Sequence, residues 1–266
     1  SKGIMGFLVN SYSVSASEVS AWSDTYSDDN LKAYYKMNED SGDVINVSEG
    51  TADLGSPADL QLTGAIYATP STPSAFDDKA LSFDGTNDYA TAGSSKSQFN
   101  FMHNLTSGKS SVNVWVQNDW DTGYGCLYTT AGEGAGTYYG AMVQHTDTSG
   151  TIISRVLMGT DPNGVGITQT GYDTDSDFHM LTFVVDMTIT TNCIKVYQDG
   201  SLLGQANRNN AGVNGNSRSP LNLGSTWDGG SQFFEGDMLE MSIFNEILTP
   251  EMITSLYNDG DGRPIY

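Results

Sequence analysis

Three carboxylates near the C-terminus have the spacing of a hydrolytic site. Glu235, Asp237 and Glu240 follow the pattern Glu-x-Asp-x-x-Glu. Retaining glycoside hydrolysis needs two carboxyl groups about 5–5.5 Å apart, and a bulged strand can turn such a pair to one face. The segment is therefore a candidate catalytic motif.

A second acidic pattern has the spacing of a calcium loop. Asp173, Asp175 and Asp177 alternate along the chain, and calcium takes six to eight oxygen ligands. The segment is not an EF-hand, because Phe178 replaces the glycine at the sixth position and Val184 the acid at the twelfth. A solvated loop is the alternative interpretation.

A third group of residues has the chemistry of a carbohydrate-binding surface, in which an aromatic platform is combined with planar polar groups. Trp120 and Trp227, which have Asp beside them and Gly close by, are the preferred contacts. The same interpretation includes Tyr124, Tyr139, His145 and Arg155. The alternative is that these side chains cap the edge of the fold or contact a neighbouring module.

These residues lie among short stretches that alternate apolar and polar side chains, as half-buried strands do. About a dozen such stretches at spacings near ten residues predict an all-β sandwich of two packed sheets. The expected strands are 31–37, 58–68, 80–92 (broken at 84–87), 111–117, 125–130, 138–145, 151–158, 179–186, 193–198, 201–204, 221–225 and 236–244. Asp84-Gly85 and Asp199-Gly200 are hairpin signals.

Two short helices are expected at 15–23 and 249–257, each opened by a hydroxyl cap, Ser15 or Thr249. The two segments resemble each other, as in a weak internal repeat. Residues 1–30 are accordingly expected to be the tail of a preceding similar module or a linker. The sandwich then spans 31–258, and 259–266 form a C-terminal linker.

Composition limits the partners. The net charge of −21 disfavours nucleic acid and anionic membranes, since both repel acidic surfaces. No run of 18 apolar residues is present, so membrane insertion is not expected. Cys126 and Cys193 could form one disulfide, but both lie in apolar strands and are expected to be buried thiols.

The order of motifs resembles the laminin-G-like modules of the concanavalin A-like lectin/glucanase superfamily. The most specific segment is Ala80–Tyr89, with its Asp-Gly-Thr-Asn turn. The other matching segments, in the family's order, are Ala33–Gly42, Val112–Val116, Phe178–Phe183, Val196–Gly200 and Phe234–Glu251. The resemblance implies a two-sheet antiparallel jelly roll in which Trp115 faces inward.

The resemblance also bears on the acidic residues. It implies a structural Ca²⁺ held by an acid on the closing strand and another near the first, here Glu240 and Glu39, although Leu239 replaces the usual Asp before the closing Glu. Glucanases of this superfamily carry the Glu235/Asp237/Glu240 pattern in mid-chain, whereas here it lies on the closing strand. Catalysis is therefore not the expected activity.

Modules of this family are common in extracellular adhesins and in structural proteins of phages and archaeal viruses. The expected function is a non-catalytic binding module at an extracellular, cell or virion surface. Its partner would be a glycan or surface protein of a host or neighbouring cell. A structural tile that binds neighbouring modules or copies of itself is the alternative, and a β-glucanase is the second.

Overall fold

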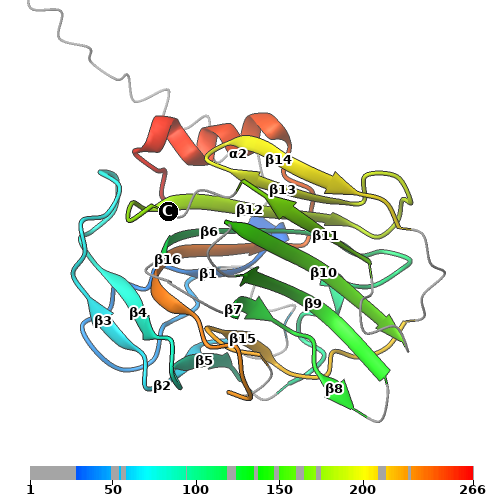
Figure 1. The fold of residues 1–266 in the computed structure, drawn as a ribbon, viewed down its shortest axis with the longest axis horizontal. Coiled ribbons are helices and arrows are strands. Elements are labelled where there is room, and N and C mark those ends of the chain that lie inside the picture. Colours follow the sequence, from blue (N-terminus) through cyan, green and yellow to red (C-terminus); the bar gives the residue numbers. More distant parts are fainter. Residues whose placement is uncertain are drawn as a thin grey trace, which may run out of the picture.

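The computed structural model describes residues 28–48, 54, 58–93, 95–118, 124–134, 137–146, 150–159, 165–171, 175–208, 214–226 and 229–265. In this part of the chain two antiparallel sheets of eight strands each form a sandwich (Figure 1). The expected all-β fold is therefore confirmed. The expected helix at 15–23 lies outside the described residues.

Sheet A has the strand order β14-β13-β12-β6-β16-β4-β3, and β1 also pairs with β16. The bounds of its strands are β1 Leu31–Tyr35, β3 Ile66–Ala68, β4 Ala80–Asp84, β6 Lys109–Asn118, β12 His179–Asp186, β13 Ile194–Gln198, β14 Ser201–Ala206 and β16 Glu235–Phe244. A β-bulge interrupts β16 between Leu239 and Ser242, and Glu240 within it has a φ of 53°.

Sheet B has the strand order β11-β10-β9-β7-β15-β5-β2, and β8 also pairs with β9. The bounds are β2 Leu60–Thr63, β5 Tyr89–Ala92, β7 Tyr124–Thr129, β8 Glu133–Gly134, β9 Thr137–Thr146, β10 Thr151–Gly159, β11 Val165–Thr170 and β15 Leu221–Leu223. Strands β8 and β11 were not predicted. Short 3-10 helices lie at Asp28–Asn30 (η1), Asn100–Met102 (η3) and Asn258–Gly260 (η4).

The main core lies between the sheets and is built from alternate residues of facing strands, as the two-residue period of a strand requires. Val112, Val114 and Val116 of β6 and Phe183 of β12 contribute from sheet A. Tyr128 of β7 lies edge-on to Phe183, with ring centroids 5.8 Å apart, and joins the two sheets. Both cysteines are free and buried, as predicted.

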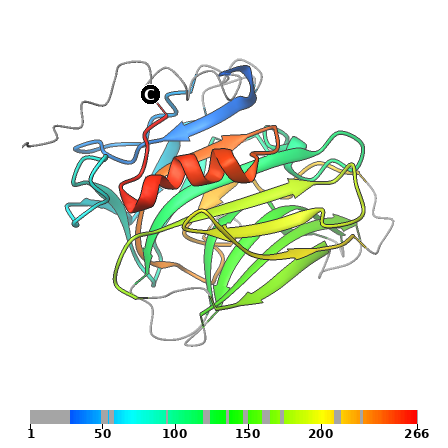
Figure 2. The ribbon, with the colours of Figure 1, turned by 90° about the horizontal axis from the view of Figure 1, so that it is seen from above.

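A second apolar cluster covers the outer face of sheet A beneath helix α2 (Pro250–Tyr257). Figure 2 shows the helix lying across this sheet. Trp115 belongs to this cluster and stacks on Tyr257 at 5.9 Å, so the expectation that it faces inward is wrong. Its neighbours Val114 and Val116 take the inward positions, because successive side chains of a strand point to opposite faces.

Helix α2 begins where the sequence predicts. Pro250 occupies the first turn, and the Thr249 side chain accepts a hydrogen bond from the Met252 amide at 3.3 Å. Ile253 and Leu256, three residues apart, are the buried residues of its inner face.

The two Asp-Gly turns have different roles. Asp199-Gly200 connects β13 and β14 in a hairpin, with both residues at positive φ, as predicted. Asp84-Gly85 was also expected to be a hairpin, but β4 pairs with β16 and β3, whereas β5 pairs with β15 and β2. This turn therefore carries the chain from sheet A to sheet B. Gly64 carries the chain in the other direction, from sheet B to sheet A, and splits the expected single strand 58–68 into β2 and β3.

The C-terminal residues expected to form a linker pack on the sandwich as far as they are described. Ile265 is 9% exposed, and its amide donates to the Tyr34 hydroxyl at 3.2 Å. The Asp261 carbonyl accepts from the Ala75 amide at 2.9 Å. These contacts extend the folded unit to Ile265 and correct the expected boundary at 258. Among the helices of the described residues, none has the length and apolar character needed to cross a bilayer.

Candidate functional site

The outer face of sheet B carries two of the predicted glycan contacts, Tyr124 and Arg155. Ala141 and Val143 belong to the inter-sheet core, so Met142 and Gln144 on the same strand, β9, point outward. The pairing register with β7 and β10 places on the same face Tyr124, Cys126, Thr146, Thr151, Ile153, Arg155 and Leu157. Tyr124 is 54% exposed, which leaves an aromatic ring available at the start of β7.

A pair of side-chain amides crosses the middle of this face. Gln232 follows the loop after β15, and its carbonyl accepts from the Cys126 amide of β7 at 2.9 Å. Its side-chain carbonyl accepts a hydrogen bond from the Gln144 amide group of β9. Gln144 is buried, whereas Gln232 is half-buried. The pair presents planar polar groups between Tyr124 and β10, and neither glutamine was singled out in the sequence.

Arg155 supplies the charge on this face. It is half-buried on β10, opposite Met142 of β9 and Gly166 of β11. A Cβ added at Gly166 would lie 2.8 Å from Arg155 Cγ, so the arginine stem occupies the space that glycine leaves. In the part of the chain that is described, the Arg155 side chain makes no hydrogen bond or ion pair.

The other residues predicted to bind a glycan are placed differently. Tyr139 packs at one end of the sandwich, where Arg218 lies 5.7 Å from its ring centroid and Gly215 lies against the ring. His145 is 2% exposed and lies between the sheets, with its Nε2 3.0 Å from the Asn118 side-chain amide. It cannot reach a ligand on the outer face, so its assignment needs correction. Trp120 and Trp227 lie outside the described residues.

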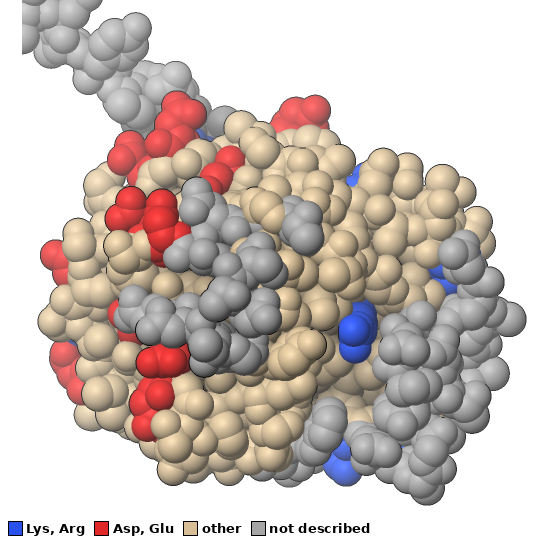
Figure 3. Space-filling view, in the orientation of Figure 1, with Lys and Arg blue, Asp and Glu red and all other residues tan. Residues whose placement is uncertain are grey.

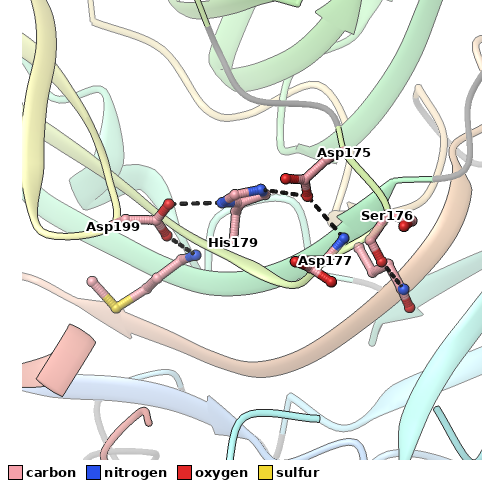
Figure 4. A network of polar contacts seen from close by, with 7 residues as sticks. Asp175, Ser176, Asp177, His179 and Asp199 are labelled. Carbon is pink, nitrogen blue, oxygen red and sulfur yellow. Dashed lines mark hydrogen bonds and ion pairs between the residues drawn. The ribbon is translucent and has the colours of Figure 1, made fainter. Parts of the chain in front are cut away.

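A histidine held between two carboxylates lies at the start of β12 (Figure 4). His179 Nδ1 is 2.7 Å from Asp199, and Nε2 is 3.1 Å from Asp175. The hydrogen bond to Asp199 is the main cause that raises the pKa of His179 to about 9. The imidazole is therefore charged at neutral pH and is unsuited to act as a general base.

This histidine network has a structural purpose. Asp199 also accepts from the Met180 amide at 2.9 Å, which ties the β13–β14 turn to β12. Asp175 also accepts from the Asp177 amide at 2.9 Å, and Gln117 of β6 donates to the Ser176 carbonyl. The network joins one loop, one turn and the end of a central strand. Asp175 is thus already engaged by protein donors, and Asp173, which would complete the calcium pattern, lies outside the described residues.

Glu240 and Glu39, the other expected calcium ligands, each have a partner within the protein. Glu240 accepts from the Tyr34 hydroxyl, and burial raises the pKa of this carboxyl to about 7. Glu39 accepts from the Ile45 amide at 2.9 Å. In the described residues no group of three or more His, Cys, Asp or Glu side chains could hold a metal ion. These residues do not fit the calcium site that the resemblance implies.

The carboxylates of the candidate catalytic motif lie on sheet A. Glu235 is exposed and pairs with Asp84 of β4, whereas Glu240 lies beneath Tyr34, whose hydroxyl also holds the C-terminal tail. The motif is better explained by a structural role, because it lies where β16 contacts β1 and the C-terminal tail.

Comparison with known proteins agrees with this architecture. A laminin-G type family model, described as the concanavalin A-like lectin/glucanases superfamily, matches residues 84–254. No curated protein sequence matches the chain. Domain 4 of an extracellular arabinanase from Geobacillus stearothermophilus, solved in complex with arabinotriose, shares 18% identity at a TM-score of 0.56. That match covers 85% of this chain and 97% of the arabinanase domain.

Two further structures share the fold. The binding domain of botulinum neurotoxin DC, solved in complex with SialylT, has 12% identity and a TM-score of 0.57 over 87% of this chain and 52% of that one. Trypanosoma rangeli sialidase in complex with sialic acid has 16% identity and a TM-score of 0.59 over 88% of this chain and 34% of the sialidase. This chain thus spans about half of the neurotoxin domain and a third of the sialidase. With a family model that matches well over half of its length and a two-sheet antiparallel sandwich, the chain belongs to the concanavalin A-like lectin/glucanases superfamily.

Proposed function

We propose that this chain is a non-catalytic glycan-binding module that acts in adhesion at an extracellular, cell or virion surface. The observation that carries the proposal is the outer face of sheet B, where Tyr124, the Gln144–Gln232 amide pair and Arg155 are brought together. Sugar rings stack on aromatic side chains, and their hydroxyls bind amides and guanidinium groups.

Two related observations support the proposal. Structures of the same fold have been solved with arabinotriose and with SialylT, although at these identities the likeness concerns the fold alone. The carboxylate motif of β16 is on the opposite sheet from Tyr124 and Arg155, so binding on sheet B does not bring a ligand to Glu235 or Glu240. Trp120 and Trp227 remain predicted contacts.

The direct test is titration of the protein with a panel of oligosaccharides, followed by repetition with Tyr124→Ala and Gln232→Ala. Both variants are expected to weaken binding at least about tenfold, because each removes one of the few accessible contacts of the proposed site. Leu202→Ala is the matched control, since Leu202 is 48% exposed but lies on β14 of sheet A. Unchanged binding in both sheet B variants would count against this face.

A second candidate function is a structural tile that associates with copies of itself. Strand β3 ends the pairing order of sheet A, and its Ile66 is 65% exposed. Exposed apolar edge strands favour pairing with another chain. Light scattering over a range of concentrations tests this function, and Ile66→Lys is expected to abolish any association that uses this edge.

A further inference from the structure

Charge is distributed unevenly over this strongly acidic molecule. From Tyr124 to Gly171, Arg155 is the one Lys or Arg, and the side chains of the three acidic residues of this stretch, Glu133, Asp147 and Asp161, are not described. In Figure 3 the visible acidic residues gather on the side of β3 and β4, while Lys and Arg are the charged residues visible on the side of β9 to β11. On the outer face of sheet B the described charged side chain is therefore that of Arg155, within a chain of net charge −21.

The acidic side of the molecule has little influence on this face. Four strand spacings separate β10 from β5 in sheet B, which is roughly 19 Å at about 4.8 Å per spacing. The Debye length is about 8 Å at physiological ionic strength. An anion that approaches Arg155 is therefore screened from the carboxylates near β4 and β5, such as Asp84 and Asp88.

Arg155 is free to bind such an anion. It has no hydrogen-bond or ion-pair partner in the described chain, whereas Lys79, on the acidic side, is paired with Asp40 at 2.6 Å. Its stem lies over Gly166 and extends the side chain from β10 across β11. A guanidinium group binds a carboxylate through two parallel hydrogen bonds, a geometry that a neutral sugar does not offer.

The spacing indicates the size of the ligand. Tyr124 lies opposite Thr146 and Arg155 opposite Met142, so two strand spacings and four residues separate them, or roughly 16 Å between backbones. A span of this length suits an oligosaccharide better than a single sugar. We infer that this face binds an acidic oligosaccharide, with a neutral part stacked on Tyr124 and a sugar carboxylate on Arg155. This inference rests on the proposed function and specifies its ligand class.

The test is a titration with matched acidic and neutral ligands. Galacturonic acid oligomers are compared with their methyl esters, and sialyllactose with lactose. At least one acidic member is expected to bind about tenfold or more tightly than its neutral counterpart. Arg155→Gln is expected to abolish that preference. Arg155→Lys is expected to keep part of it, because lysine retains the charge but lacks the two parallel N–H donors of the guanidinium group. Lys195→Gln on β13 of sheet A removes the same charge elsewhere and should leave the preference unchanged.

The outcomes separate this inference from the proposed function. One possible outcome is that acidic and neutral ligands bind equally, that Arg155→Gln changes the affinity for neither, and that Tyr124→Ala weakens the binding of both. In that case the acidic ligand class is wrong, while the glycan-binding face stands. If the Arg155→Gln variant still binds acidic ligands more tightly than neutral ones, the inference is also overturned. If Tyr124→Ala and Arg155→Gln both leave glycan binding intact, or if no ligand binds, the proposed function fails with it.

Discussion

The two outer faces of this sandwich are built from the same alternation of side chains but are used differently. On sheet A the outward residues are large and apolar, and helix α2 and the C-terminal tail cover them around Trp115. On sheet B the face keeps an exposed tyrosine, an amide pair and an arginine without a described partner. Cys126, Met142 and Leu157 of this face are buried as well, so Tyr124, Gln232 and Arg155 are the accessible residues through which it could bind a ligand.

The largest expected effect lies on sheet A. Trp115→Ala should lower the free energy of unfolding by about 3–5 kcal/mol, because it removes a fully buried aromatic and its contacts with Tyr257 and Phe76. Tyr124→Ala on sheet B should change stability by no more than about 0.5 kcal/mol. Urea unfolding of both variants measures the difference. Equal losses would mean that the two faces do not divide stability and recognition as described.

The histidine network should make stability depend on alkaline pH. The pKa of His179 is raised from 6.5 to about 9, so its stabilisation is fully present below pH 6.5 and is lost as pH rises through 9. Because solvent partly screens this half-buried group, the expected loss is about 1–2 kcal/mol. Denaturant midpoints between pH 6 and 10 measure it, and Asp199→Asn should flatten the profile. A wild-type profile as flat as that of the variant would contradict the assignment.

Glu240 should also make stability fall as pH rises, but over a lower pH range than His179. Burial raises its pKa from 4.5 to about 7, so the folded state disfavours the ionised form and stability falls as pH rises from 4.5 through 7. Glu240→Gln is expected to stabilise the protein by about 1–2 kcal/mol at pH 8 and to have little effect at pH 4. Thermal unfolding at both pH values checks this.

The same variant tests calcium at this position. Because the described residues do not form a metal site, added CaCl₂ is expected to shift the melting temperatures of the wild type and Glu240→Gln equally. A calcium-dependent rise in the wild type alone would show that Glu240 is a ligand after all.

The smallest expected effect concerns the helix that covers sheet A. Thr249→Ala removes the cap of α2 and should cost about 1 kcal/mol. Thr254→Ala, at an exposed position within the same helix, should be neutral or slightly stabilising, because alanine favours helix. Urea unfolding distinguishes the two, and equal behaviour would show that the cap contributes nothing.

Much of the fold could be predicted from the sequence because strand alternation and turn residues are local signals. The β12 strand and helix α2 begin where their patterns indicate. The partner of a strand is not a local property, which is why Asp84-Gly85 and Asp199-Gly200 look alike in sequence but form a crossover and a hairpin. Strand β11 was missed because Gly166 breaks a short apolar pattern.

The candidate site was predicted only in part. Tyr124 and Arg155 were chosen for their chemistry, and the structure places both on one face. His145 was chosen with them but points inward. The sequence did not reveal this, because Met142, Ile153 and Leu157 make the outer face as apolar as the inner one, so the alternation does not show which residues point outward. Gln144 lies one position from His145, so the alternation could have indicated it. Gln232 joins the site through a contact between residues 88 positions apart, which no local pattern reveals.

The most direct test of the central claim is a map of backbone amide chemical shifts during titration with an oligosaccharide that binds. The account predicts that the largest shifts occur at residues 124–126, 142–146 and 151–155 and around Gln232, with little change in β6, β12 or α2. Shifts concentrated near α2 or the His179 network, with sheet B unchanged, would contradict the assignment of sheet B as the binding face.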